Sequence, residues 1–95
     1  MTTYEALYII NADLDEEATK ATIEKFKGIV EANAGEIVSI DEWGKRKLAY
    51  AINFKTEGYY VLMTYSSEAG VPAELERNFR NDERIMRYMT TVKEA

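Results

Sequence analysis

The residues best suited to chemistry in this sequence are three consecutive cations, Lys45, Arg46 and Lys47, in the stretch WGKRKLAYAI. Ammonium and guanidinium groups bind phosphate oxygens, the guanidinium through two parallel hydrogen bonds. A strand does not require adjacent cations in order to fold. We therefore expect these side chains to meet an anionic ligand.

Positive charge is local in a chain that is acidic overall. The formal net charge is -5, yet residues 43–56 carry four bases and no acid, whereas residues 1–42 carry ten acids and three bases. Attraction to phosphate is screened over about 8 Å at physiological salt, so a local basic strip can bind where the average charge would not. The acidity of the chain therefore does not exclude a nucleic-acid ligand.

The composition removes the usual reagents of catalysis. Without cysteine or histidine, the chain has no disulfide, no thiolate, and neither the commonest general base nor the commonest metal ligand. We find no glycine-rich phosphate loop and no nucleophile beside a base. The longest apolar runs are far shorter than the roughly 20 residues of a membrane span, and the start is not a signal segment. We expect a cytoplasmic protein that is not an enzyme, with no cofactor, metal, membrane or small-molecule substrate.

Hydrophobic periodicity predicts six elements in a single domain over residues 1–95. Alternation predicts strands, and apolar residues three or four apart predict helices. In chain order they are a strand at residues 4–11, a helix of about five turns from Asp13 that stops at Gly35, and a long strand at 37–52 with a bulge or bend at Gly44. A polar hairpin loop at 53–58 connects it to a strand at 59–65. A helix with Pro72 in its first turn and a strand at 85–92 complete the six.

The predicted order β-α-β-β-α-β is the split β-α-β arrangement of the α+β ferredoxin-like fold. Right-handed crossovers place the first and third strands in the middle of a four-stranded antiparallel sheet, with two helices on one face. The second strand is then an edge strand, and the basic stretch lies on it.

Two interpretations of the basic edge are open. Natural proteins protect edge strands with charged side chains, and the charges could serve that purpose alone. However, protection needs one or two charges of either sign, whereas here acids stop at Glu42 and three cations follow. Neighbouring side chains of a strand point to opposite faces, so Lys45 and Lys47 share one side and Arg46 takes the other. Such an edge suits a ligand that wraps it, as a nucleic-acid backbone does.

A second group of cations runs from the second predicted helix to the end of the last strand: Arg77, Arg80, Arg84, Arg87 and Lys93. Arg77 and Arg80 fit a solvated helix face better than a binding site. Arg87 is the better candidate, because a lone guanidinium in a strand can reach a phosphate or stack on a base.

One face of the sheet should remain open. In the first and third strands Leu7, Ile9, Tyr60 and Leu62 alternate with a second apolar set, and only one set can face the helices. The other set forms an apolar surface, which usually marks a partner unless loops or the chain ends cover it. Whichever of the two sets faces outward, the surface is largely aliphatic, so it favours a protein partner over base stacking.

The stretch GKRKLAYAI at residues 44–52 resembles the signature of the family of the sixth protein of the bacterial ribosomal small subunit (the S-six, or bS6, family): a glycine, a basic pair, then Leu-Ala-Tyr-x-Ile. Three further places are similar to that family over essentially the whole chain: Tyr4-Glu5, residues 57–60, and Phe79-Arg80-Asn81-Asp82 with Ile85, Arg87 and Met89.

The resemblance implies a structural constituent of the ribosome. It implies binding to small-subunit (16S) ribosomal RNA in the platform, as a heterodimer with the eighteenth small-subunit ribosomal protein, a basic partner. By position, the resemblance implies that Arg46, Lys47, Tyr50 and Arg87 contact RNA or border the partner. Together with the charge and face patterns, we assign RNA binding to Lys45, Arg46, Lys47, Tyr50, Arg87 and Lys93, and the partner interface to Leu7, Ile9, Glu42, Trp43, Leu48, Tyr60 and Leu62.

Another class of function stays open from the residues alone. A ferredoxin-like regulatory or small-ligand-binding domain could dimerise through its open sheet face. An acylphosphatase-like enzyme is a more distant alternative, since it would need an arginine-bearing phosphate loop after the first strand, and the residues from Asn11 onward supply none.

Overall fold

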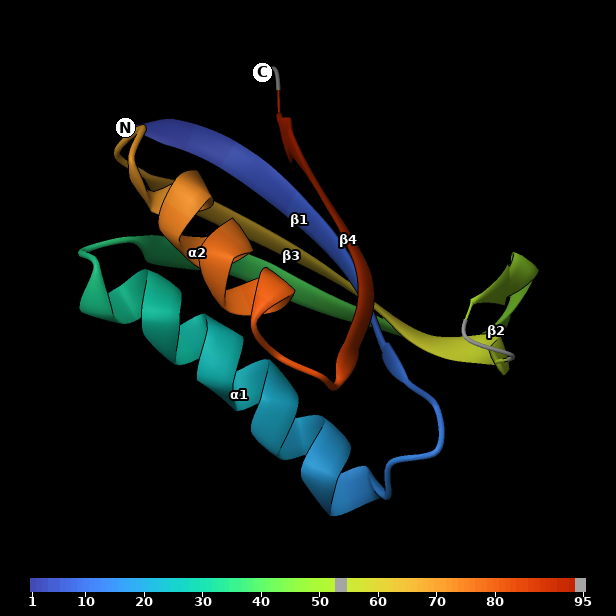
Figure 1. Cartoon of the computed structure of the whole chain (residues 1–95). Coiled ribbons are helices and arrows are strands. Elements are labelled where there is room, and N and C mark those ends of the chain that lie inside the picture. The colour runs from blue at the N-terminus through green and yellow to red at the C-terminus, as the bar shows by residue number, and fades with distance from the viewer. Residues whose placement is uncertain (53–54, 94–95) are drawn as a thin grey trace.

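A computed structural model describes residues 1–52 and 55–93, with side chains at all of these positions except 49–52 and 55. The elements are β1 (Thr2–Asn11), α1 (Glu16–Ala32), β2 (Glu36–Ile52), β3 (Lys55–Ser67), α2 (Val71–Arg80) and β4 (Ile85–Val92). All strand pairs are antiparallel and the sheet order is β2-β3-β1-β4. Both helices cover one face of the sheet (Figure 1). The predicted ferredoxin-like fold is confirmed.

The core lies between that face and the helices. Alternate residues of β1 and β3 point into it, and four rings, from Tyr8, Phe26, Phe79 and Tyr88, pack with centroids 4.4 to 5.5 Å apart. The strand period of two sends the intervening residues to the opposite side. We call that side, away from the helices, the open face.

The ends of the helices follow local capping. Asp15 is the N-cap of α1, and its Oδ1 accepts the backbone N–H of Ala18 at 2.8 Å, while Glu16 and Glu17 lie favourably at the positive end of the helix dipole. The helix ends at Ala32, earlier than the expected stop at Gly35, and Ala34 takes the positive φ of 62° that often follows a helix. In α2, Pro72 lies in the first turn as predicted.

The predicted loop at residues 53–58 is wrong in its second half, since β3 already begins at Lys55, which pairs with Ile52. Residues 53 and 54 lie outside the described part. Thr56 and Glu57 are exposed, so this segment lacks the apolar alternation by which a half-buried strand is predicted. β1 ends at Asn11, opposite Gly58. Residues 55–57 of β3 therefore pair with β2 alone, and the two strands form a ribbon that projects from the sheet (Figure 1).

Among the described residues, neither helix is long and apolar enough to cross a membrane.

Candidate nucleic-acid and partner interface

The predicted bulge in β2 is confirmed at Gly44, and it decides which side chains share a face. Glu42 pairs with Val61 and Gly44 pairs with Tyr60, so Trp43 is the additional residue, and Gly44 has a φ of 82°. In a regular strand, residues three apart lie on opposite faces; across a one-residue bulge they lie on the same face. Trp43 is thereby brought to the open face together with Arg46.

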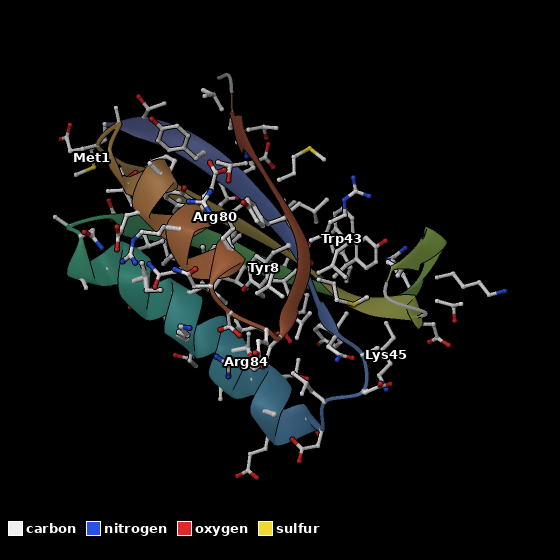
Figure 2. The ribbon with its side chains drawn as sticks, viewed as in Figure 1. Met1, Tyr8, Trp43, Lys45, Arg80 and Arg84 are labelled. Carbon is white, nitrogen blue, oxygen red and sulfur yellow. The ribbon has the colours of Figure 1, made fainter. Side chains whose placement is uncertain are left out.

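Arg46, Trp43 and Tyr60 form a cluster of planar groups on the open face that we call the Trp43 stack. The guanidinium carbon of Arg46 lies over the Trp43 ring, 5.5 Å from its centroid. The Trp43 and Tyr60 centroids are 6.1 Å apart with ring planes 8° from parallel. The indole Nε1–H donates to Asp41 Oδ2 at 3.3 Å. Trp43 lies on the side of the sheet away from the helices (Figure 2).

Glu42 and Lys45 lie on the helix side of the same edge. Tyr59 Oη donates to Glu42 Oε1 at 2.8 Å, and this hydrogen bond, with burial second, raises the pKa of Tyr59. Glu42 and Lys45 line a hollow of about 290 Å³ beside the start of α1. Glu42, which we had assigned to the partner interface, therefore lies apart from the rest of that set.

The middle of the open face is apolar. Leu7 of β1 lies between Leu62 of β3 and Met89 of β4, and Ile9 lies between Tyr60 and Arg87. A hollow of about 50 Å³ beside Leu7, Ile9 and Met89 marks the β4 side. Met89 is 58% exposed and was not predicted as an interface residue. The available signal was its position two residues after Arg87 on the last strand, which puts both side chains on the same face.

Leu48 completes this surface at the ribbon. A Cβ on Gly58 would stand 3.4 Å from Leu48 Cδ2 and would overlap Ile9 Cγ2. The absence of a side chain at Gly58 therefore lets Ile9 and Leu48 approach each other across β3. Six of the seven residues assigned to the partner interface are thus brought to the open face: Leu7, Ile9, Trp43, Leu48, Tyr60 and Leu62.

The cations assigned to RNA do not form one patch. Lys45 and Lys47 pair with Tyr59 and Glu57 on the helix side, as the alternation predicted, and Arg46 lies on the open face. Arg87 reaches the open face from the opposite margin, on β4. Exposed Lys93 follows β4, where its backbone N–H donates to Thr3 O at 2.9 Å. The Tyr50 side chain lies outside the described part.

We expect Gly44→Ala to lower the free energy of unfolding by about 1 kcal/mol, because a β-carbon is strained at positive φ although no atom obstructs it. Urea unfolding followed by circular dichroism measures this. Gly28→Ala is the matched control: Gly28 lies inside α1 with equally open surroundings, so alanine there should stabilise by about 0.5 kcal/mol or more. Equal effects at the two sites would contradict the assignment of strain to Gly44.

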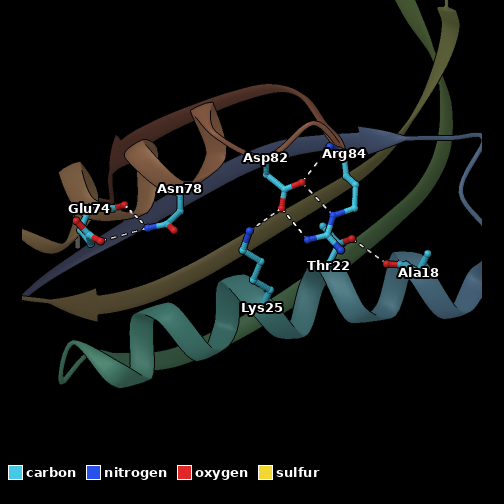
Figure 3. Close-up of polar contacts among 7 residues, drawn as sticks. All are labelled: Ala18, Thr22, Lys25, Glu74, Asn78, Asp82 and Arg84. Atoms are coloured by element: carbon cyan, nitrogen blue, oxygen red, sulfur yellow. Dashed lines mark hydrogen bonds and ion pairs between the residues drawn. The ribbon is translucent and has the colours of Figure 1, made fainter.

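Asp82 is a buried carboxylate that no sequence pattern indicated, with a side chain only 5% exposed. It accepts hydrogen bonds from Lys25 Nζ at 2.8 Å, from Arg84 Nη2 at 2.7 Å and Nε at 2.9 Å, and from the Arg84 backbone N–H at 3.0 Å (Figure 3). Chiefly through the Arg84 hydrogen bonds, and despite burial, the pKa of Asp82 is held well below its usual range.

This network has a structural role, since it ties α1 to the turn between α2 and β4. Arg84 is committed to it. On α2, Arg77 pairs with Glu74 at 2.6 Å on the solvated surface, in keeping with the prediction for that helix.

The fold and the surfaces together define a ferredoxin-like α+β domain with a basic edge and an apolar sheet face that neither helix covers among the described residues. Comparison with known proteins assigns it to a family.

The sequence profile described as "Ribosomal protein S6" matches residues 3–92. The chain is similar to the small ribosomal subunit protein bS6 of Clostridium novyi, with 52% identity over 94 residues and 99% of each chain covered. It is similar to that of Thermoanaerobacter pseudethanolicus, with 51% identity over 89 residues and 94% of each chain covered. The crystal structure of the 30S ribosomal protein S6 of Thermotoga maritima superposes with a TM-score of 0.92 at 30% identity, covering 97% of this chain and 87% of that one.

The chain belongs to the ribosomal protein S6 family. It is accordingly a structural protein of the small ribosomal subunit, located on the ribosome in the cytoplasm, and it is not an enzyme.

Proposed function

We propose that the chain, acting as one domain over residues 1–95, binds 16S ribosomal RNA together with the eighteenth small-subunit protein as a heterodimer in the platform. One observation carries this proposal. The open face is apolar in its middle, around Leu7 and Leu62, and has a cation at each margin, Arg46 on β2 and Arg87 on β4.

The middle of the open face is suited to the protein partner. Within the described residues both helices cover the opposite face (Figure 1), so Leu7 and Leu62 stay partly exposed and Met89 is 58% exposed. A contiguous apolar surface of this kind marks a protein contact. The net charge of -5 would steer a basic partner toward this chain.

The β2 edge is suited to RNA. Lys45 and Lys47 on the helix side and Arg46 on the open face present cations to both sides of one strand. A phosphate backbone that follows the edge can meet all three. The strip is short, so the chain alone neutralises few phosphates, and the basic partner supplies the remaining charge.

The test is RNA binding over a salt series, with and without the partner. Lys47→Gln should make the slope of log affinity against log salt shallower by about 0.7 to 0.9, the release expected from one lost phosphate contact. Lys20→Gln is the matched control, because Lys20 is exposed on α1 and pairs with Glu16 at 3.3 Å; it should leave the slope unchanged.

Addition of the partner should tighten RNA binding markedly. Equal affinity in both conditions would count against the heterodimer. Sedimentation separates the alternative class: a stable homodimer that is indifferent to RNA would support a regulatory domain that dimerises through its open face.

A further inference from the structure

Arg46 places a positive charge on the aromatic surface of the Trp43 stack. Among the described residues no acid forms an ion pair with Arg46. Its guanidinium instead makes a cation–π contact with the Trp43 ring. Asp41 already accepts the indole N–H. Trp43 is nevertheless 38% exposed. What the stack offers a ligand is therefore a planar cation over a π surface.

We propose that the Trp43 stack binds one unpaired nucleobase of the RNA, which stacks on the Arg46 guanidinium as a further layer beyond Trp43 and Tyr60. The inference rests on the proposed RNA binding and specifies its mode. Unpaired bases stack on aromatic side chains and on guanidinium planes, and every base has a π face. The Trp43 and Tyr60 rings are nearly parallel and the guanidinium lies over Trp43, so a base would extend an existing cluster of planar groups.

Charge distinguishes this site from the apolar middle of the open face, so the inference reassigns Trp43 and Tyr60 from the partner interface to RNA. An apolar side chain seated on Arg46 would bury a cation without a partner, which costs several kcal/mol. A basic protein would bring further cations to it. RNA instead supplies a planar base for the stack and phosphates for the flanking cations, and Lys45 and Lys47 stand across the same edge.

The geometry also explains why the bulge is at Gly44. Without the extra residue, Trp43 and Arg46 would lie on opposite faces of β2, and the guanidinium would have no aromatic ring beneath it. The bulge leaves cations for phosphate on the helix side and assembles the aromatic platform on the open face.

Trp43 is the only tryptophan of the chain, so its fluorescence reports on the stack directly. The probes are single-stranded oligouridylate, whose bases stack weakly on one another, and a double-stranded RNA of the same length that contains this strand, each titrated at low salt with filter binding in parallel. We expect the single strand to quench Trp43 emission at saturation. The duplex should bind through its phosphates and leave the emission unchanged, because its bases are already stacked.

Two variants separate stacking from charge. Arg46→Lys keeps the charge and loses the plane, so it should weaken single-strand binding roughly 10-fold and leave the salt slope and duplex affinity unchanged. Lys47→Gln should flatten the salt slope and keep the quenching. Both positions are exposed on an edge strand, so the variants should fold, which circular dichroism checks.

Several results would overturn the proposal. Equal quenching by duplex and single strand would do so, as would unchanged emission when filter binding shows the single strand bound. So would a shift of Trp43 emission to shorter wavelength on adding the partner protein alone, with no further change on adding RNA, since a protein would then occupy the stack. Absence of any RNA binding on the filter, with and without partner, would overturn the proposed function as well, which distinguishes the two failures.

Discussion

Leu7→Lys should weaken association with the eighteenth small-subunit protein by at least about 100-fold, while the domain itself stays folded. Leu7 lies at the centre of the open face, between Leu62 and Met89. Central, desolvated positions carry most of the binding energy of an interface, and an unpaired cation buried there against a basic partner costs about 3 kcal/mol or more. In the free protein the lysine stem can lie along the apolar surface with its ammonium in water.

Isothermal titration calorimetry with the partner measures this effect. Ala21→Lys is the matched control, because it adds the same charge on the exposed side of α1 and should change the affinity far less. Leu7→Lys should also leave RNA binding in the absence of the partner intact, since it removes no cation. Undiminished partner affinity for Leu7→Lys would show that the partner docks elsewhere.

Asp82→Asn should lower the free energy of unfolding by about 2 kcal/mol at pH 7. The carboxylate is almost fully buried and receives Lys25 and Arg84; an amide would leave both cations with a weaker acceptor and turn a donor toward them. Since Lys25 and Arg84 are 40% and 34% exposed, water screens part of the loss. Urea unfolding, which leaves the ionic strength unchanged, measures it.

The same carboxylate gives the protein a predictable response to acid. The pKa of Asp82 is lowered in the folded state, mainly by the Arg84 hydrogen bonds, whereas in the unfolded chain it is about 4. As the pH falls below about 4, Asp82 is protonated in the unfolded state but not in the folded state, so unfolding becomes more favourable. The stabilisation is therefore complete above that pH and is lost below it.

The difference in stability between the wild-type protein and Asp82→Asn should accordingly shrink between pH 5 and pH 2, as measured by urea unfolding at each of these values. Glu74→Gln is the control, because Glu74 also accepts a two-point contact from an arginine, Arg77, but at the solvated surface of α2. Its effect should be far smaller. A constant difference across the pH range for Asp82→Asn would contradict the buried-network account.

The order of the elements and the place of the basic stretch followed from local patterns. Strand alternation, helical spacing and turn residues are properties of short segments, and the handedness of crossovers restricts how such segments assemble. The edge position of β2, the bulge at Gly44 and the alternation of Lys45, Arg46 and Lys47 were predicted on these grounds. The start of β3 at Lys55 was not, because Thr56 and Glu57 are both exposed and give no hydrophobic period.

What the tertiary structure alone decided concerns contacts between distant residues. Asp82 meets Lys25 across 57 positions of the chain, and no local pattern indicates such a pair. Each of β1 and β3 has two alternating apolar sets, and only the packing of the helices decides which set is covered. This places Leu7 and Leu62 on the open face. The bulge was predictable, but its consequence was not: one additional residue reverses the facing of Lys45, Arg46 and Lys47 relative to a regular strand, and this puts Arg46 over Trp43.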